Sequence, residues 1–308
     1  MKPRTGARER FFAAIHRNDA RARARVPFRA LVAVALLAGA GWAPRATAAS
    51  CTRLAASPVC PPAGRPILAE DFETEGGPVH ARLIEHPRLS VAAGEGTGGG
   101  RALRARYVGG PMGSERIVRL VPLPTPGIEY TLNYDVKFDR HFQFVRGGKL
   151  HGLGPAHAVA GGNPMRPDGW SARVMWRGDG VAETYTYHQD QQDRYGDRGR
   201  AHRRFRFRPG RYHAVSLHVR LNEPVDRANG FARLYVDGEL VESRERVRFR
   251  AIESEATRIT QLLFSTFHGG NDPSWAPRGA AGEYGEVQAY FDNIAVYPGG
   301  RIREKPGA

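Results

Sequence analysis

A pair of glycines precedes one of the rare lysines of this 308-residue chain. Gly147 and Gly148 are followed by Lys149, in a sequence that holds four lysines against 42 arginines. Glycine lets the backbone approach another group closely, and the pKa of a lysine can be lowered in a way that arginine does not allow. Lys149 is therefore a candidate for acid–base chemistry. Most single lysines are solvated surface groups, so this segment by itself is equally compatible with a surface lysine that has no role in catalysis.

A second segment with reactive side chains spans residues 169–187, where two alternating runs flank Gly178-Asp179-Gly180. The pattern predicts two strands joined by a tight turn. Alternate residues of a strand share a face, so the small and apolar residues of the first run lie on one face of the strand and the polar residues on the other. The polar face carries Ser171, Arg173, Met175 and Arg177, and the apolar face carries Ala172, Val174 and Trp176.

The loop length decides what lies opposite these polar residues. With a three-residue loop, Arg173 lies opposite Tyr185 and Ser171 opposite Tyr187, which gathers four polar-tipped side chains in one patch. A two-residue loop would shift the register by one residue and separate the pairs. An exposed sheet face on which arginine and tyrosine pack only for stability is an equal alternative.

The rest of the chain must position these residues, and from Pro66 onward it alternates as strands do. Apolar and polar residues alternate through Glu129–Phe138 and through Arg211–Leu221, and Asp237-Gly238 joins Phe231–Val236 to Glu239–Val241 as a hairpin. Further strands are predicted at Ile67–Phe72, Ala102–Val108, Arg116–Val121, Ile259–Phe267 and Val287–Tyr297. No stretch keeps a helical period for three turns, so no helix is predicted. We expect an all-β fold, an antiparallel β-sandwich of jelly-roll type, as one domain over 66–298 with a loose tail at 299–308.

The N-terminal region is typical of an export signal. A basic stretch, an apolar run and an Ala-Thr-Ala site predict a signal peptide over 1–48, and hence a secreted or periplasmic protein. The apolar run is too short to span a bilayer. In an oxidising compartment, Cys51 and Cys60 of the following segment, 49–65, are expected to form a disulfide, with lipidation of Cys51 as the alternative. Of the net charge of +15, residues 1–48 carry +8, which leaves +7 for the remainder.

These motifs together resemble polysaccharide lyase family 14, the alginate and glucuronate-polymer lyases with a jelly-roll fold. The similarity rests on Gly147-Gly148-Lys149-Leu150, on Ser171-x-Arg173-x-Met175-Trp176-Arg177, on Glu183-x-Tyr185-x-Tyr187, and on the later Phe264-Ser265-Thr266-Phe267 and Phe291-Asp292-Asn293. The resemblance implies catalytic roles for Lys149, Ser171, Arg173, Tyr185 and Tyr187. We expect the substrate-binding residues around them to be Gln143, Arg146, His151, Arg177, Glu183 and Trp275. His151 stands where the family usually has proline.

The implied reaction explains the residue types. A lyase removes the proton at C5 of a uronate, beside the carboxylate, and expels the oxygen at C4. A cation at the carboxylate stabilises the enolate-like intermediate, which suits Lys149 and Arg173, with a hydrogen bond from Ser171. The base is left open among Tyr185, Tyr187 and Lys149. The scheme requires no metal or other cofactor.

Other functions fit the sequence less well. The basic run Arg198–Arg208 would suit nucleic acid, but an exported protein seldom meets it, so an acidic polysaccharide is the expected partner. No paired carboxylates of a glycoside hydrolase are evident. A glycan-binding module that uses Trp170, Tyr185, Tyr187 and Trp275 as stacking platforms is the main rival. We expect a monomer without a membrane span.

Overall fold

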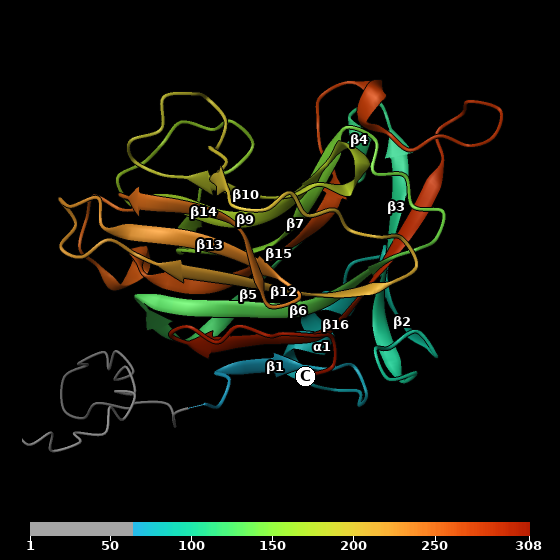
Figure 1. Ribbon diagram of the computed structural model, residues 1–308, viewed down its shortest axis with the longest axis horizontal. Coiled ribbons are helices and arrows are strands. Elements are labelled where there is room, and N and C mark those ends of the chain that lie inside the picture. The colour runs from blue at the N-terminus through green and yellow to red at the C-terminus, as the bar shows by residue number, and fades with distance from the viewer. Residues whose placement is uncertain (1–63) are drawn as a thin grey trace, which may run out of the picture. The chain divides into compact units, whose positions relative to one another are not determined.

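The computed structural model describes residues 64–308, which fold into two sheets packed face to face (Figure 1). The larger sheet runs in the order β11-β14-β13-β12-β6-β16-β3-β2, with β1 beside β16 and β4 beside β3. The smaller sheet runs β10-β9-β7-β15-β5, with β8 beside β9. Every strand pair is antiparallel except that of the two-residue β8. The predicted all-β antiparallel sandwich of jelly-roll type is confirmed.

The strand bounds match most of the predicted segments. The larger sheet contains β1 (Leu68–Glu70), β2 (Leu89–Ala93), β3 (Arg101–Gly110), β4 (Gly113–Ser114), β6 (Glu129–Phe138), β11 (Arg200–Ala201), β12 (Tyr212–Arg220), β13 (Gly230–Val236), β14 (Glu239–Val247) and β16 (Glu286–Pro298). The smaller sheet contains β5 (Ile117–Gly127), β7 (Gly147–Gly154), β8 (His157–Ala158), β9 (Gly169–Arg177), β10 (Ala182–Tyr187) and β15 (Ile259–His268).

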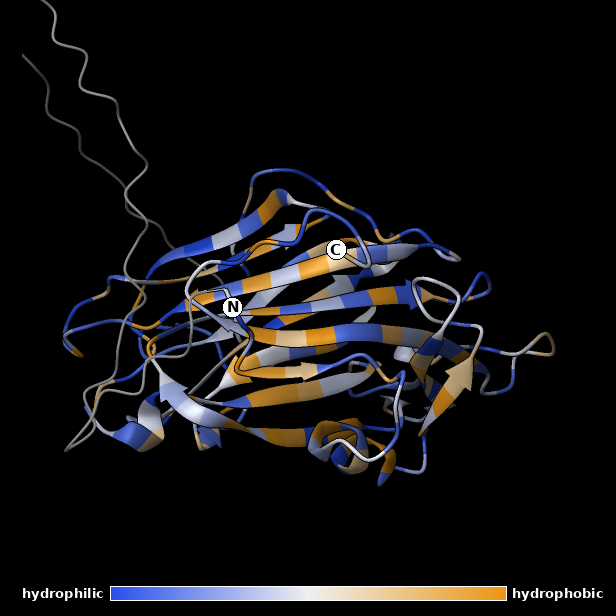
Figure 2. Cartoon of the chain, turned by 90° about the horizontal axis from the view of Figure 1, so that it is seen from below, coloured by the Kyte–Doolittle hydropathy of each residue, from blue (hydrophilic) through white to orange (hydrophobic). Residues whose placement is uncertain are grey.

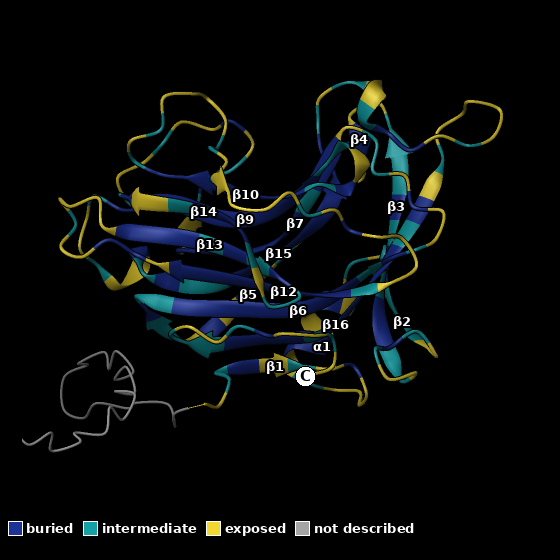
Figure 3. Cartoon of the chain, viewed as in Figure 1, coloured by how far each residue is buried: buried dark blue, intermediate teal, exposed yellow. Residues whose placement is uncertain are grey.

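The core lies between the sheets and is built by alternation along the strands. Figure 2 shows apolar and polar residues alternating along many strands, and Figure 3 shows that the strands are largely buried whereas the loops are exposed. The apolar face of β6 packs inward, as does that of β9 through Ala172, Val174 and Trp176, all three fully buried. One face of β9 is thereby committed to the core, which leaves the opposite face for the polar residues.

The structure contains short helical elements that periodicity did not predict. Helix α1 (Pro78–Ile84) has seven residues and buries Val79, His80 and Leu83, and one-turn 3₁₀ helices occur at Gly178–Gly180, Glu255–Thr257 and Pro273–Trp275. The prediction of no helix is therefore wrong in detail. Two turns hold too few residues to show a helical period, and packing against the sheet supplies the stability that so short a helix lacks in isolation.

The C-terminal residues are docked on the larger sheet, so the prediction of a loose tail is wrong. Arg303 is buried, its Nη1 lies 2.8 Å from Oδ1 of the fully buried Asp135, and its backbone N–H donates to Ser216. The Gly307 N–H donates to the same aspartate. The polar face of β6 is covered rather than solvated, because the tail supplies the partners that its buried polar groups need.

Two predictions lie outside the described residues: the signal peptide at 1–48 and the Cys51–Cys60 disulfide. Within residues 64–308, no helix has the length and apolar character needed to cross a bilayer.

Candidate active site

The hairpin of β9 and β10 has the register that a three-residue loop predicts. Tyr185 pairs with Arg173 and Tyr187 with Ser171 across the two strands. Asp179 and Gly180 take positive φ angles of 60° and 73° in the turn, which glycine and aspartate tolerate better than most residues. The four polar-tipped side chains therefore lie on one face of the smaller sheet, as predicted.

Strand β7 brings the lysine to the same face. Lys149 pairs with Met175 on β9 and with Phe267 on β15. A Cβ atom at Gly148 would lie 2.1 Å from the Trp176 ring, and one at Gly152 would lie 2.7 Å from Cγ of Arg173. The glycines therefore let β7 settle against the core tryptophan, and they leave room for the arginine to lie across the strand.

Lys149 is held in an apolar and electropositive environment. Its Nζ lies 3.9 Å from Sδ of Met175 and 3.9 Å from the centre of the Tyr185 ring. Within residues 64–308, no carboxylate forms an ion pair with it. Burial lowers the pKa of Lys149 well below its usual range, and the charges of Arg173, Arg177 and Arg116 lower it further against the opposing effect of Glu183. The neutral amine, a base, is thereby favoured.

Arg173 is a buried cation that also has no carboxylate partner among residues 64–308. Its Nη1 donates to Ser171 Oγ over 3.0 Å, and that hydroxyl donates to the carbonyl of Val159 over 2.6 Å. Its Nε has no hydrogen-bond partner. Burial lowers the pKa of Arg173 to about 10, so the guanidinium stays charged near neutral pH. A buried, uncompensated cation of this kind is suited to receive an anionic group.

The two tyrosines have different surroundings although their rings meet edge to face, with centroids 5.6 Å apart. The Tyr187 hydroxyl is fully buried and accepts a hydrogen bond from the Gly162 N–H over 2.9 Å. Burial raises the pKa of Tyr185, and its hydrogen bond with Tyr187 raises it further. Tyr185 is consequently protonated near neutral pH and can donate its proton.

Arg177 and Glu183 form an ion pair beside this cluster. Nε of Arg177 donates to Oε1 of Glu183 over 2.5 Å, and the carboxylate is far less exposed than the arginine. Burial raises the pKa of Glu183, whereas the arginine charge opposes that shift. The pair leaves a smaller net charge near Lys149 than Arg177 would exert without its partner.

His151 does not belong to the site, so its prediction as a substrate-binding residue is wrong. Its side chain is fully buried in the core, stacked on Phe264 with ring centroids 4.0 Å apart, and its Nδ1 bonds the Ser265 carbonyl. The pairing of β7 with β9 is interrupted between Lys149 and Gly152. This bulge places Leu150 and His151 both on the core side, although strict alternation would separate them.

The other three predicted binding residues lie in loops that hold one another. The side-chain amide of Gln143 donates to the Arg278 carbonyl and accepts from its N–H, which commits the glutamine to the loop. Arg146 donates to Ser274 and lies over the ring of Trp275, 5.1 Å from its centroid. This pair adjoins the end of β7 where Gly147 pairs with Arg177.

Two residues at the site were not predicted. Met175 packs on Lys149, and its position on the polar face of β9 was the signal that could have identified it. Arg116 contributes to the field at Lys149 from outside the two motifs, with its guanidinium over the Phe267 ring. Within residues 64–308, no group of three or more His, Cys, Asp or Glu side chains is placed to hold a metal ion.

The fold and the site define a class: a β-sandwich whose smaller sheet presents a lysine, an uncompensated arginine and two tyrosines on one face. The family profile for polysaccharide lyase 14 matches residues 122–294, more than half of the chain. The protein therefore belongs to polysaccharide lyase family 14. A search of curated proteins found no match.

Solved structures of lyases share the fold. The alginate lyase of this family from Aplysia kurodai is 23% identical, with a TM-score of 0.57 over 76% of this chain and 99% of that one. The endo-β-1,4-glucuronan lyase from the fungus Trichoderma reesei is 15% identical, with a TM-score of 0.54 over 79% and 99%. A double mutant of the alginate lyase Aly36B in complex with alginate trisaccharide is 25% identical, with a TM-score of 0.53 over 64% and 81%.

Proposed function

We propose that the protein cleaves a uronic-acid polymer of the alginate or glucuronan type by β-elimination. The observation that carries this proposal is the packing of Lys149, without a carboxylate partner, against Met175 and Tyr185 and close to Arg173. A neutral amine beside a buried cation is the pair that proton removal next to a carboxylate requires. Membership of a lyase family supports the same reaction. The similar structures include both alginate and glucuronan lyases, so both polymers are candidate substrates.

In this proposal Arg173 binds the carboxylate of the sugar that loses its proton. Its guanidinium is oriented by Ser171, which is itself fixed by the Val159 carbonyl. Negative charge moves onto the carboxylate as the C5 proton leaves, and a cation already buried there stabilises that charge more strongly than an exposed one would. Ser171 has its own proton committed to Val159, so we assign it the positioning of Arg173.

Lys149 is the base and Tyr185 the acid of the proposed elimination. The lone pair of the neutral Nζ takes the C5 proton, and the electrons of that C–H bond move onto the carboxylate as the enolate-like intermediate that Arg173 stabilises. These electrons then return to form the C4–C5 double bond as the C4–O bond breaks, and Tyr185 gives its proton to the departing oxygen. Both assignments follow the pKa shifts, since burial lowers the pKa of the lysine and raises that of the tyrosine.

Tyr187 has a supporting role in this scheme. Its hydroxyl is fully buried and binds the backbone of Gly162, so it holds the loop before β9 against the site. Its hydrogen bond with Tyr185 also helps to keep the acid protonated. Of the three candidate bases that the sequence left open, we therefore propose Lys149.

The cellular location belongs to the same proposal. The basic, apolar and Ala-Thr-Ala pattern of residues 1–48 supports export, and a polysaccharide substrate would be met outside the cytoplasm. N-terminal sequencing of the protein recovered from the periplasm or medium tests this, with a new N-terminus near residue 49 expected. An uncleaved N-terminus in the cytoplasmic fraction would contradict it.

The ultraviolet absorbance of the unsaturated uronate product tests the reaction. Purified protein is incubated with alginate and with glucuronan, beside the variants Lys149→Ala and Tyr185→Phe. We expect absorbance to rise with the wild type on one polymer and to be reduced by about 10²- to 10⁴-fold in each variant. The exposed residues Lys305 and Tyr284 provide matched controls, Lys305→Ala and Tyr284→Phe, which should retain full activity. Binding of the polymers without any rise would instead support a glycan-binding module.

A further inference from the structure

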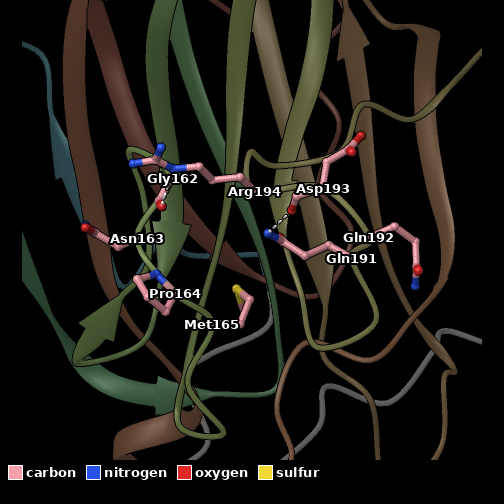
Figure 4. Close-up of a pocket in the computed structure, with 8 residues that line it drawn as sticks. All are labelled: Gly162, Asn163, Pro164, Met165, Gln191, Gln192, Asp193 and Arg194. Atoms are coloured by element: carbon pink, nitrogen blue, oxygen red, sulfur yellow. Dashed lines mark hydrogen bonds between the residues drawn. The ribbon is translucent and has the colours of Figure 1, made fainter.

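A cavity of about 480 Å³ lies between two loops at the edge of the active site (Figure 4). One wall is the loop before β9 and the other is the loop after β10. The residues that line it are Gly162, Asn163, Pro164, Met165, Gln191, Gln192, Asp193 and Arg194. Its volume is within the range of about 300–1,000 Å³ that is usual for small-ligand sites. The catalytic scheme above uses none of these side chains.

Two residues of the cavity wall contact the tyrosine end of the site. The Gly162 N–H in its wall donates to the Tyr187 hydroxyl. Met165, from the same wall, packs against the cluster that contains Met175, Tyr185 and Tyr187. A polymer whose reacting sugar lies against Lys149 and Tyr185 can therefore extend a neighbouring sugar into this space.

Figure 4 shows the carboxylate of Asp193 directed away from the other lining side chains, and those have the chemistry of a site for an anionic sugar. The side-chain amide nitrogen of Asn163 donates to the Ala160 carbonyl, and that of Gln192 donates to the Asp190 carbonyl. The side-chain carbonyl oxygen of each residue is left free to accept a hydrogen bond from a sugar hydroxyl group. Arg194 donates through Nε to the Gly162 carbonyl over 3.1 Å, and its two amino groups have no hydrogen-bond partner among residues 64–308. Those two groups can bind a carboxylate in the bidentate manner. Pro164 and Met165 offer apolar surface to the sugar ring.

The loop that carries Arg194 is anchored at both ends by ion pairs with β14 and the residue that follows it. Asp190 pairs with Arg248 over 2.7 Å, and Asp197 pairs with Arg244 over 2.8 Å. In Figure 4 the Arg194 side chain reaches from its own loop across to Gly162. The wall is therefore preorganised, which lowers the entropic cost of binding a sugar there.

We propose that this cavity is an outer subsite that takes one uronate residue of the polymer. Arg194 binds its carboxylate, and the free amide oxygens of Asn163 and Gln192 accept from its hydroxyl groups. This inference rests on the proposed function, because the occupant is a neighbour of the sugar that reacts. Through this subsite, Arg194 would make the enzyme prefer longer oligomers and polymers that carry a carboxylate on each sugar.

A series of oligouronates of increasing length tests the subsite. We expect kcat/KM of the wild type to rise steeply at the length that first fills the cavity. Arg194→Gln should remove about tenfold or more of that rise, as expected for a lost charge-assisted hydrogen bond, and change kcat/KM on the shortest substrate less than twofold. Arg194→Lys should restore part of the rise. Arg227→Gln, a change at an exposed arginine on another loop, is the matched control and should leave the whole series unchanged.

Two results would overturn the subsite. An equal loss at every length would show that Arg194 only holds the Gly162 loop, and an unchanged series would show that it binds nothing. Binding of the same oligomers to Lys149→Ala protein separates this proposal from the proposed function. If the wild type eliminates none of them, the reaction fails, and the subsite is then judged by whether Arg194→Gln in the Lys149→Ala background weakens binding of long oligomers alone.

Discussion

Replacement of His151 by leucine is expected to make the protein less sensitive to acid without altering its activity. The imidazole lies fully buried among Tyr134, Phe264 and Phe291, and its Nε2 has no partner. Burial lowers the pKa of His151 to about 3 in the folded protein. Leucine has a similar volume and cannot be protonated, so it keeps the packing and removes the titration.

The magnitude follows from the difference between the folded and unfolded states. In the unfolded chain a histidine has a pKa of about 6.5. As the pH falls below that value, the unfolded state binds a proton that the folded state cannot bind, so the free energy of unfolding decreases. The loss is small at about pH 7, reaches about 2 kcal/mol at about pH 5, and continues to grow until the pH approaches the folded pKa of His151, about 3.

Urea denaturation of the wild type and His151→Leu at about pH 7 and about pH 5 measures this effect. We expect the stability of the variant relative to the wild type to improve by about 2 kcal/mol between the two pH values. The variant also loses the hydrogen bond to the Ser265 carbonyl, which shifts its free energy of unfolding by the same amount at both pH values. Only the change in the stability difference between the two pH values is therefore diagnostic. His141→Leu, at an exposed position, is the control. A difference that stays constant with pH, or a KM for polysaccharide that rises in His151→Leu, would refute the reasoning.

Three further predictions concern the field at the site, the docked C-terminus and the basic edge of the sheet. Arg177→Gln removes a charge that lowers the pKa of Lys149, so the acidic limb of the pH profile of kcat/KM should move to higher pH; an unmoved limb would argue against Lys149 as the base. Arg303→Met leaves the buried Asp135 unpaired and should lower the free energy of unfolding by about 3–5 kcal/mol, whereas a loss below about 1 kcal/mol in chemical denaturation would show that the tail is not part of the cooperative unit. Arg204→Gln with Arg208→Gln, at exposed positions beside β10 without ion-pair partners among residues 64–308, should raise KM for the polymer at low salt and lose that effect at high salt; a rise in KM that is independent of salt would contradict steering by charge.

The parts of the fold that local pattern controls were predictable from the sequence. The β9–β10 register followed from alternation and from one three-residue loop, and it placed Ser171, Arg173, Tyr185 and Tyr187 together. The β13–β14 hairpin followed in the same way from Asp237-Gly238, whose positive φ angles fit the turn. In both cases the information lies within about twenty residues of sequence.

What the sequence did not reveal depends on contacts between distant segments. A bulge in β7 turned His151 toward the core, and nothing in its own alternation marks the extra residue. Arg116 reaches the site because β5 pairs with β15, which in turn pairs with β7. The docking of Arg303 on Asp135 likewise joins residues far apart in the chain.

The isotopic composition of the cleavage products tests the central claim most directly. Alginate or glucuronan is degraded by the wild type in water enriched in heavy oxygen, and the products are weighed by mass spectrometry. Elimination initiated by Lys149 predicts unsaturated ends without solvent oxygen, and no product above background from Lys149→Ala. Saturated products, each one water heavier than its unsaturated counterpart, or undiminished cleavage by Lys149→Ala, would contradict the account.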